Sequence, residues 1–157
     1  MENKIKIIIA DDNKGFCDLL LKYFKKYEDV EVLAIAYTDE EEIKQIEELK
    51  PEIVVTDLVR NHKYTGLDII KEYSQKKEHP KFLVISADKK EDIFCENLKI
   101  EGYIKKPFDD YDIIINEIRR IKKDTINEEK QIIVKQEKIF KKCNFFEKIL
   151  RFFKVIK

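Results

Sequence analysis

Three acidic residues and one lysine stand at the ends of apolar runs in this 157-residue chain. Asp11 and Asp12 end the run IKIIIADD, Asp57 ends PEIVVTD, and Lys106 follows GYIK. Because open parallel α/β sheets bind their ligands at the carboxyl ends of the strands, we expect these four residues to converge on one pocket. Clustered carboxylates repel one another and require a cation, and an oxygen-rich site suits Mg²⁺. The pattern therefore indicates a magnesium site for phosphoryl chemistry.

The residue types at this site predict separate chemical roles. Asp57 is the expected nucleophile, because carboxylates form acyl phosphates. Asp12 and Asp57 would each give one oxygen to Mg²⁺, and Asp11 would bind it directly or through water. Ser86, at the end of KFLVIS, would donate a hydrogen bond to one phosphoryl oxygen, and Lys106 would pair with another. An acidic residue at a strand end often caps the next helix instead, so the whole set carries the prediction rather than Asp57 alone.

Alternating strands and amphipathic helices would position these residues. Apolar runs predict strands over 5–10, 30–36, 52–57, 81–86 and 100–104. Helical spacing of apolar residues predicts helices over 14–27, 40–49, 66–77 and 89–98, and a fifth that runs to about 123. Five successive β-α units predict an α/β fold with a doubly wound, five-stranded parallel sheet. The expected topology is flavodoxin-like, with strand order 2-1-3-4-5 and a C-terminal helical extension.

Charge divides the chain into two predicted parts. The chain is neutral overall, but residues 1–129 carry a formal charge of −7 and residues 130–157 carry +7. We expect a domain over 1–123 and a basic amphipathic helical tail over 124–157. No signal peptide precedes the first strand and no apolar run is long enough to span a bilayer, so we expect a cytoplasmic protein. The chain shows no recognisable DNA-reading motif, and direct binding to DNA is not expected.

The predicted tail places its apolar residues on one side of a helix. That side holds Phe145, Phe146, Ile149, Leu150, Phe152, Phe153 and Ile156. The opposite side is mainly cationic. A basic amphipathic helix of this kind can lie on an anionic membrane surface, with peripheral attachment at the inner membrane face. It can equally form a homodimer or pack on another protein surface, and a disordered tail is the third alternative.

Residues 4–123 resemble the receiver domain of bacterial two-component response regulators. The resemblance rests on the Asp11-Asp12 pair, Asp57, Ser86-Ala87 and Lys106-Pro107-Phe108. The opening stretch, IKIIIADDNKGFCDLLLKYFKKYEDVEVLAIAY, is similar to the receiver half of the sporulation master regulator of spore-forming Firmicutes. No DNA-binding domain of that regulator's kind is recognisable after residue 123.

The resemblance implies a phosphorelay component that is a phosphoprotein rather than an enzyme, with at most weak self-catalysed phosphorylation and dephosphorylation. It implies that Asp57 accepts a phosphoryl group from a phosphohistidine on a histidine kinase or a histidine phosphotransfer protein. It also implies that Ser86 and Tyr103 form the conformational switch, although an aromatic residue at position 103 could simply pack. The backbone carbonyl of Val59 is implied as a further Mg²⁺ ligand.

The loop after Asp57 departs from the family pattern. Arg60-Asn61 stand where receivers usually carry Met-Pro or a similar pair, and Gly66 lies nine residues after Asp57 instead of eight. We therefore keep two main hypotheses. The first is a stand-alone receiver that signals by protein–protein contact, as a relay, a phosphate sink or a competitor. The second is a phosphorylation-independent adaptor or membrane-tethered pseudo-receiver acting through the tail. A Mg²⁺-dependent phosphatase is disfavoured, because Val59 stands where that chemistry needs a second aspartate.

Overall fold

A computed structural model describes residues 4–61, 63, 65–87 and 98–155, with side chains described as far as residue 140. Five parallel strands form one sheet in the order β2-β1-β3-β4-β5, which confirms the flavodoxin-like topology. The strands are β1 (Ile5–Ala10), β2 (Val30–Ala36), β3 (Ile53–Thr56), β4 (Lys81–Ser86) and β5 (Gly102–Lys105). The helices are α1 (Lys14–Phe24), α2 (Asp39–Leu49), α3 (Thr65–Ser74) and α5 (Asp112–Val155).

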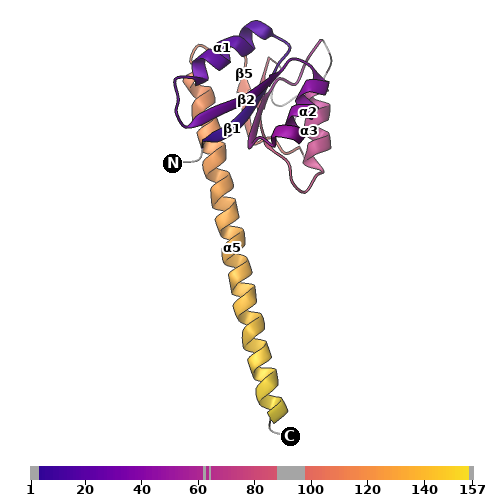
Figure 1. Ribbon diagram of the computed structural model, residues 1–157, viewed down its shortest axis with the longest axis vertical. Coiled ribbons are helices and arrows are strands. Elements are labelled where there is room, and N and C mark those ends of the chain that lie inside the picture. The colour runs from indigo at the N-terminus through magenta and orange to yellow at the C-terminus, as the bar shows by residue number, and fades with distance from the viewer. Residues whose placement is uncertain (1–3, 62, 64, 88–97, 156–157) are drawn as a thin grey trace. The chain divides into compact units, whose positions relative to one another are not determined.

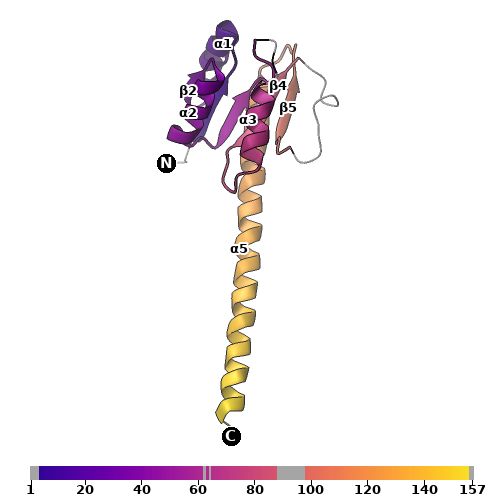
Figure 2. The ribbon, with the colours of Figure 1, turned by 90° about the vertical axis from the view of Figure 1, so that its right-hand side faces the viewer.

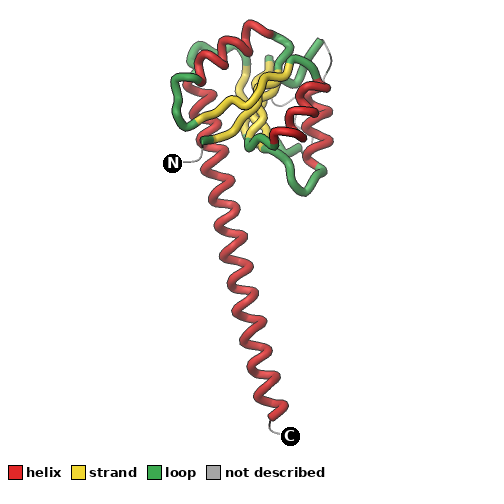
Figure 3. The backbone as a smooth tube through the Cα atoms, viewed as in Figure 1, coloured by secondary structure: helices red, strands yellow, loops and turns green. Residues whose placement is uncertain are grey.

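Helices cover both faces of the sheet, as Figure 1 and the tube in Figure 3 show. Successive strand residues point to opposite faces, so each face has its own apolar core. On one face Ile7 and Ile9 of β1 pack with α1 and the start of α5. On the other face Ile8 packs with α2 and α3. Near-continuous burial of the central strands matches their largely apolar sequences.

The register aligns the carboxyl ends of the strands that carry the candidate site residues. Ala10 of β1 pairs with Thr56 of β3, and Ser86 of β4 pairs with Lys105 of β5. Figure 2 shows β4 and β5 side by side after a quarter turn. The residues that follow these positions, Asp11, Asp57 and Lys106, therefore emerge at one edge of the sheet.

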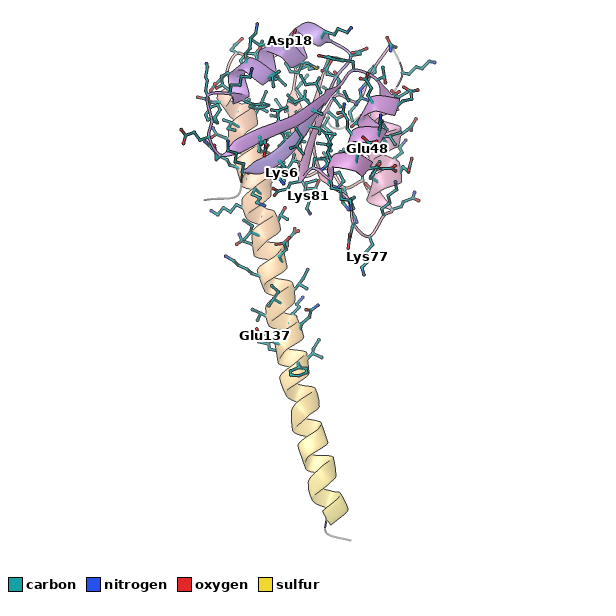
Figure 4. The ribbon with its side chains drawn as sticks, in the orientation of Figure 1. Lys6, Asp18, Glu48, Lys77, Lys81 and Glu137 are labelled. Atoms are coloured by element: carbon teal, nitrogen blue, oxygen red, sulfur yellow. The ribbon has the colours of Figure 1, made fainter. Side chains whose placement is uncertain are left out.

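Local capping residues fix where two helices begin. The Asn13 side chain accepts a hydrogen bond from the Phe16 N–H and starts α1. The Thr38 hydroxyl accepts one from the Glu41 N–H and starts α2. Charged side chains such as Asp18 on α1, Glu48 on α2 and Lys77 in the loop after α3 are exposed to solvent (Figure 4). The high charge content of the chain thus lies largely on solvated helix surfaces.

Some predicted boundaries were wrong. The fifth helix continues to Val155 instead of ending near residue 123, because residues 112–155 contain neither Gly nor Pro to stop it. Helix α3 ends at Ser74, before the predicted residue 77, and β5 begins at Gly102, two residues after the predicted start. The helix predicted over 89–98 lies, apart from its last residue, outside the described residues.

The chain divides into two units, residues 1–121 and residues 122–157. The first unit holds the sheet, the helices that cover it and the beginning of α5. The second unit is helical as far as Val155. Among the described residues, no helix combines the length and the apolar character needed to cross a membrane.

Candidate functional site

Lys106 joins two of the predicted acidic residues at the carboxyl edge of the sheet. Its Nζ lies 2.7 Å from Asp11 Oδ2 and 2.7 Å from Asp57 Oδ2. The backbone holds the three residues in place, because the Asp57 N–H donates to the Ala10 carbonyl and the Lys106 N–H donates to the Ser86 carbonyl. Residues separated by up to 95 positions in sequence thus meet at one cation.

Partial burial strengthens the electrostatics of this group. The side chains of Asp11 and Asp57 are 4% and 13% exposed, and that of Lys106 is 23% exposed. Burial alone would lower the pKa of Lys106, but hydrogen bonds to Asp11 and Asp57 outweigh it and raise that pKa. The Phe16 ring lies 4.4 Å from Lys106 Nζ and adds a cation–π contact. The ammonium group therefore remains charged at neutral pH.

Asp12 lies against the loop after β3 rather than on Lys106. Its Oδ2 accepts a hydrogen bond of 2.9 Å from the Asn61 N–H. In the same loop the Val59 N–H donates to Asp57 Oδ1 over 3.2 Å. The backbone of this loop thus donates hydrogen bonds to two of the three carboxylates, Asp12 and Asp57. The position of the loop therefore constrains the orientation of both side chains.

The donor set at this edge fits a hard divalent cation. Within the described part of the chain, no group of three acidic, histidine or cysteine side chains is already arranged to hold a metal. Even so, two carboxylates already share a cationic group, the Lys106 ammonium. Asp11, Asp12 and Asp57, with the Val59 carbonyl, would supply the oxygen ligands that Mg²⁺ prefers. In the structure, Lys106 holds one oxygen each of Asp11 and Asp57, and the Asn61 N–H holds one oxygen of Asp12, so the lysine would compete with a metal for the first two carboxylates.

Ser86 and Tyr103 lie on the two strands beside the acidic residues. Ser86 is buried at the end of β4. Tyr103 pairs in register with Val84 and is partly buried against the apolar core of the α2–α3 face. The switch assignment of these two residues stays a prediction.

The contacts of Arg60 near the site were not predicted, because in the sequence this residue stands out only as a departure in the loop. Arg60 is 3% exposed, and its guanidinium lies between Asp39 and Glu42 of α2 and the backbone of Asp57. The sequence signal for this pairing is the acidic first turn of α2, DEEE, which offers partners for a buried cation.

Solved structures share the fold of this chain at low sequence identity. The signal receiver domain of NarL from Mycobacterium tuberculosis matches with a TM-score of 0.66 at 17% identity, over 76% of this chain and 98% of that chain. The signal receiver domain of a Luxo repressor protein from Vibrio parahaemolyticus matches with a TM-score of 0.65 at 18% identity, over 80% and 98%. RcsB from Salmonella enterica serovar Typhimurium, bound to the promoter rprA with phosphomimetic BeF3-, matches with a TM-score of 0.60 at 22% identity, over 74% and 99%.

A family model extends the likeness from fold to sequence. The model described as the response regulator receiver domain matches residues 7–119, well over half of the chain. The match spans Asp11, Asp12, Asp57, Ser86 and Lys106. Receiver domains are signalling phosphoacceptors that interact with histidine kinases or phosphotransfer proteins and bind Mg²⁺ for phosphorylation. This chain belongs to the response regulator receiver family.

Proposed function

We propose that Asp57 accepts a phosphoryl group from a phosphohistidine on a histidine kinase or a histidine phosphotransfer protein, with Mg²⁺ bound by Asp11, Asp12, Asp57 and the Val59 carbonyl. The observation that carries this proposal is the shared contact of Asp57 and Asp11 with Lys106, at 2.7 Å each. The Asp57 carboxylate lies beside a cation that can receive the charge of a phosphoryl group, which supports its proposed role as nucleophile.

The chemistry is a transfer between two nucleophiles. An Asp57 carboxylate oxygen forms a bond to phosphorus while the phosphorus–nitrogen bond of the phosphohistidine breaks. The departing imidazole keeps the electron pair and takes up a proton from solvent. Lys106 pairs with one phosphoryl oxygen and Ser86 donates a hydrogen bond to another. When bound by these residues, Mg²⁺ would neutralise part of the negative charge of the three carboxylates and so allow an anionic donor to approach.

The proposed output is contact with another protein in the cytoplasm rather than binding to DNA. After phosphorylation, Ser86 would turn toward the phosphoryl group and Tyr103 would turn inward. Support comes from the pairing of β4 with β5, which sets the strands of both residues next to each other. The opening stretch of the chain, which is similar to the sporulation master regulator's receiver, favours a partner of a sporulation-type phosphorelay.

Mg²⁺ affinity should respond in opposite directions to two substitutions. Asp12→Ala removes a ligand oxygen and should weaken Mg²⁺ binding at least about tenfold, the smaller loss typical of residues that only orient a metal ligand. Lys106→Met removes the ammonium group that competes for Asp11 and Asp57 and should strengthen it. Isothermal titration calorimetry at neutral pH, without a phosphoryl donor, measures both.

Glu48→Gln, on the exposed outer face of α2, is the control for loss of a remote negative charge. Its Mg²⁺ affinity should equal that of the parent protein. An unchanged affinity in Asp12→Ala would remove Asp12 from the metal site. A weaker affinity in Lys106→Met would show that the lysine does not compete with the metal.

The second unit favours a second candidate function, namely attachment through the C-terminal helix. Five large apolar side chains in its described part are between 49% and 67% exposed, namely Ile132, Ile133, Val134, Ile139 and Phe140. The sequence beyond them adds four phenylalanines and further Lys and Arg residues. A basic helix with this much apolar surface suits an anionic membrane surface, and pairing with a second copy of the chain is the alternative.

We expect the intact chain to co-sediment with liposomes that contain anionic lipid. The double variant Phe146→Ser, Phe153→Ser should lose most of this binding, because these residues lie on the apolar side of the predicted helix. Raising the salt concentration should weaken binding of the intact chain, since part of the attraction is electrostatic.

The chain ending at Lys123 is the matched control, because it keeps all of the first unit. It should stay in the supernatant at every lipid composition. If the intact chain also stays there but forms dimers in analytical ultracentrifugation, the helix is a protein contact and the membrane proposal is wrong.

A further inference from the structure

Arg60 forms a buried ionic cluster directly behind the acidic site. One guanidinium nitrogen, Nη1, donates to Asp39 Oδ1 over 2.7 Å. The other, Nη2, lies 2.5 Å from Glu42 Oε2. The Glu42 side chain is fully buried and that of Arg60 is 2% exposed. Burial raises the pKa of Glu42, and the Arg60 charge together with the Thr56 hydroxyl counteracts it.

The same guanidinium also holds the end of β3. Its Nη2 donates to the Thr56 hydroxyl over 2.5 Å and to the Asp57 backbone carbonyl over 3.3 Å. Arg60 thus touches the main chain of the very residue whose carboxylate faces Lys106. A shift of the guanidinium would move the backbone that aims that carboxylate.

Asp39 extends the cluster to a third element. Its Oδ1 accepts hydrogen bonds from Arg60 and from the hydroxyl of Thr65, the first residue of α3. Helices α2 and α3 lie side by side on one face of the sheet (Figure 1). Asp39 therefore joins Arg60, within the loop between β3 and α3, to the first residue of α3, and Glu42 adds a second contact to Arg60.

The loop between β3 and α3 also carries the backbone N–H groups that contact the acidic site. Arg60 and Lys63 exchange two backbone hydrogen bonds of 2.9 Å, which close a tight turn. Asn61 within this turn has a φ of 48°, and its N–H donates to Asp12. The Val59 N–H donates to Asp57 just before the turn. Arg60, which stands between Val59 and Asn61, thus has its side chain buried inside the protein.

A contribution to stability does not by itself explain why the charges of Arg60 and Glu42 are buried. Buried ion pairs recover little more than the cost of desolvation, and apolar residues of similar volume often replace them without loss. Arg60 Nε has no hydrogen-bond partner among the described residues, so the cluster is not even fully satisfied. The planar guanidinium group does have a geometric use, because its N–H donors can fix the positions of several acceptors at once.

We propose that Arg60 is a positioning residue for the acceptor site, whose guanidinium ties the β3–α3 loop to α2 and so sets where Val59 and Asn61 stand relative to the metal-binding carboxylates. This inference rests on the proposed function for its link to phosphoryl transfer. In this loop, which departs from the family pattern, a buried ion-pair cluster would take the place of the proline that receivers usually carry.

The test compares the parent protein with the double variant Arg60→Met, Glu42→Gln, which removes the guanidinium and its fully buried partner and leaves only Asp39, whose side chain is 31% exposed, without its ion-pair partner. We expect Mg²⁺ affinity, measured by calorimetry, to fall about tenfold, as for other residues that orient metal ligands. In the metal-free protein, the amide hydrogens of Val59 and Asn61 should exchange with solvent at least about tenfold faster, because the loop loses its anchor. Arg60→Lys, which keeps the charge but loses the fork, should weaken Mg²⁺ binding as well.

Lys63→Met is the matched control, since it removes an exposed charge from the same turn without touching its backbone bonds. It should match the parent in both measurements. A folded double variant with parent-like Mg²⁺ affinity and parent-like exchange at Val59 and Asn61 overturns the proposal. The exchange measurement needs neither metal nor phosphoryl donor. Failure of the parent to become phosphorylated would therefore count against the proposed function and leave the role of Arg60 separately testable.

Discussion

Replacing Asp57 by Asn should abolish phosphorylation of the protein. With Mg²⁺ and a small-molecule donor such as acetyl phosphate, the parent should gain the mass of one phosphoryl group. The variant should gain none, because an amide has no anionic oxygen to attack phosphorus. The substitution also removes one of the two carboxylates on Lys106, which should leave the fold intact, since Asp11 still accepts from that lysine over 2.7 Å. Intact-protein mass spectrometry is the direct measurement.

Asp68→Asn supplies the matched control. Asp68 lies on α3 with its side chain 72% exposed and pairs only weakly, at 3.3 Å, with Lys71. This variant should be phosphorylated like the parent. Equal labelling of Asp57→Asn and the parent would mean that another residue accepts the phosphoryl group, and the assignment of Asp57 would then be wrong. Circular dichroism of both variants separates loss of chemistry from loss of fold.

The sheet and the neighbourhood of Asp57 were predictable because they depend on local patterns. Each buried strand is rich in apolar residues, as in IKIIIA or KFLVIS, and a polar residue stands at or just after its end. Parallel strands must align their carboxyl ends, so Asp11, Asp57 and Lys106 had to approach one another once the strand order was known. The two helix caps at Asn13 and Thr38 depend on residues within one turn, and such signals are also visible in sequence.

The features that escaped prediction depend on pairs far apart in the chain. Arg60 finds Asp39 and Glu42 more than fifteen positions away, and an arginine in a polar loop reads as a solvated residue unless its partners are known. The contact between Asp12 and the Asn61 N–H was not predicted either, because it joins residues that are 49 positions apart in the sequence. The length of α5 was not predicted, because the change of charge along the sequence suggested a boundary where the helix in fact continues without interruption.

Gly66→Ala should cost the receiver unit about 3 kcal/mol of its free energy of unfolding, which is at the upper end for a small-to-large change in a packed site. A Cβ atom at this position would stand 2.1 Å from the Asp57 backbone oxygen and 3.1 Å from the Leu58 Cα. Both neighbours are backbone atoms, so no side chain can rotate away to make room. The Gly66 N–H also donates to the Leu58 carbonyl over 3.2 Å, which keeps the start of α3 against the end of β3. Urea denaturation followed by circular dichroism measures the loss.

Gly15→Ala is the control that separates crowding from a general effect of replacing glycine. Gly15 lies in the first turn of α1, and the nearest atom to an added Cβ is the Asn13 side-chain oxygen at 3.5 Å, an ordinary contact. Alanine should therefore stabilise that helix by up to about 1 kcal/mol. If Gly66→Ala were as harmless, the backbone around Asp57 would have room to shift, and packing against Gly66 would not position the Asp57 carboxylate. If it destabilises as expected, the Asp57 carbonyl is closely packed against Gly66, and the same carbonyl accepts from the Arg60 guanidinium. The carboxylate that faces Lys106 would then be aimed by packing as much as by its own hydrogen bonds.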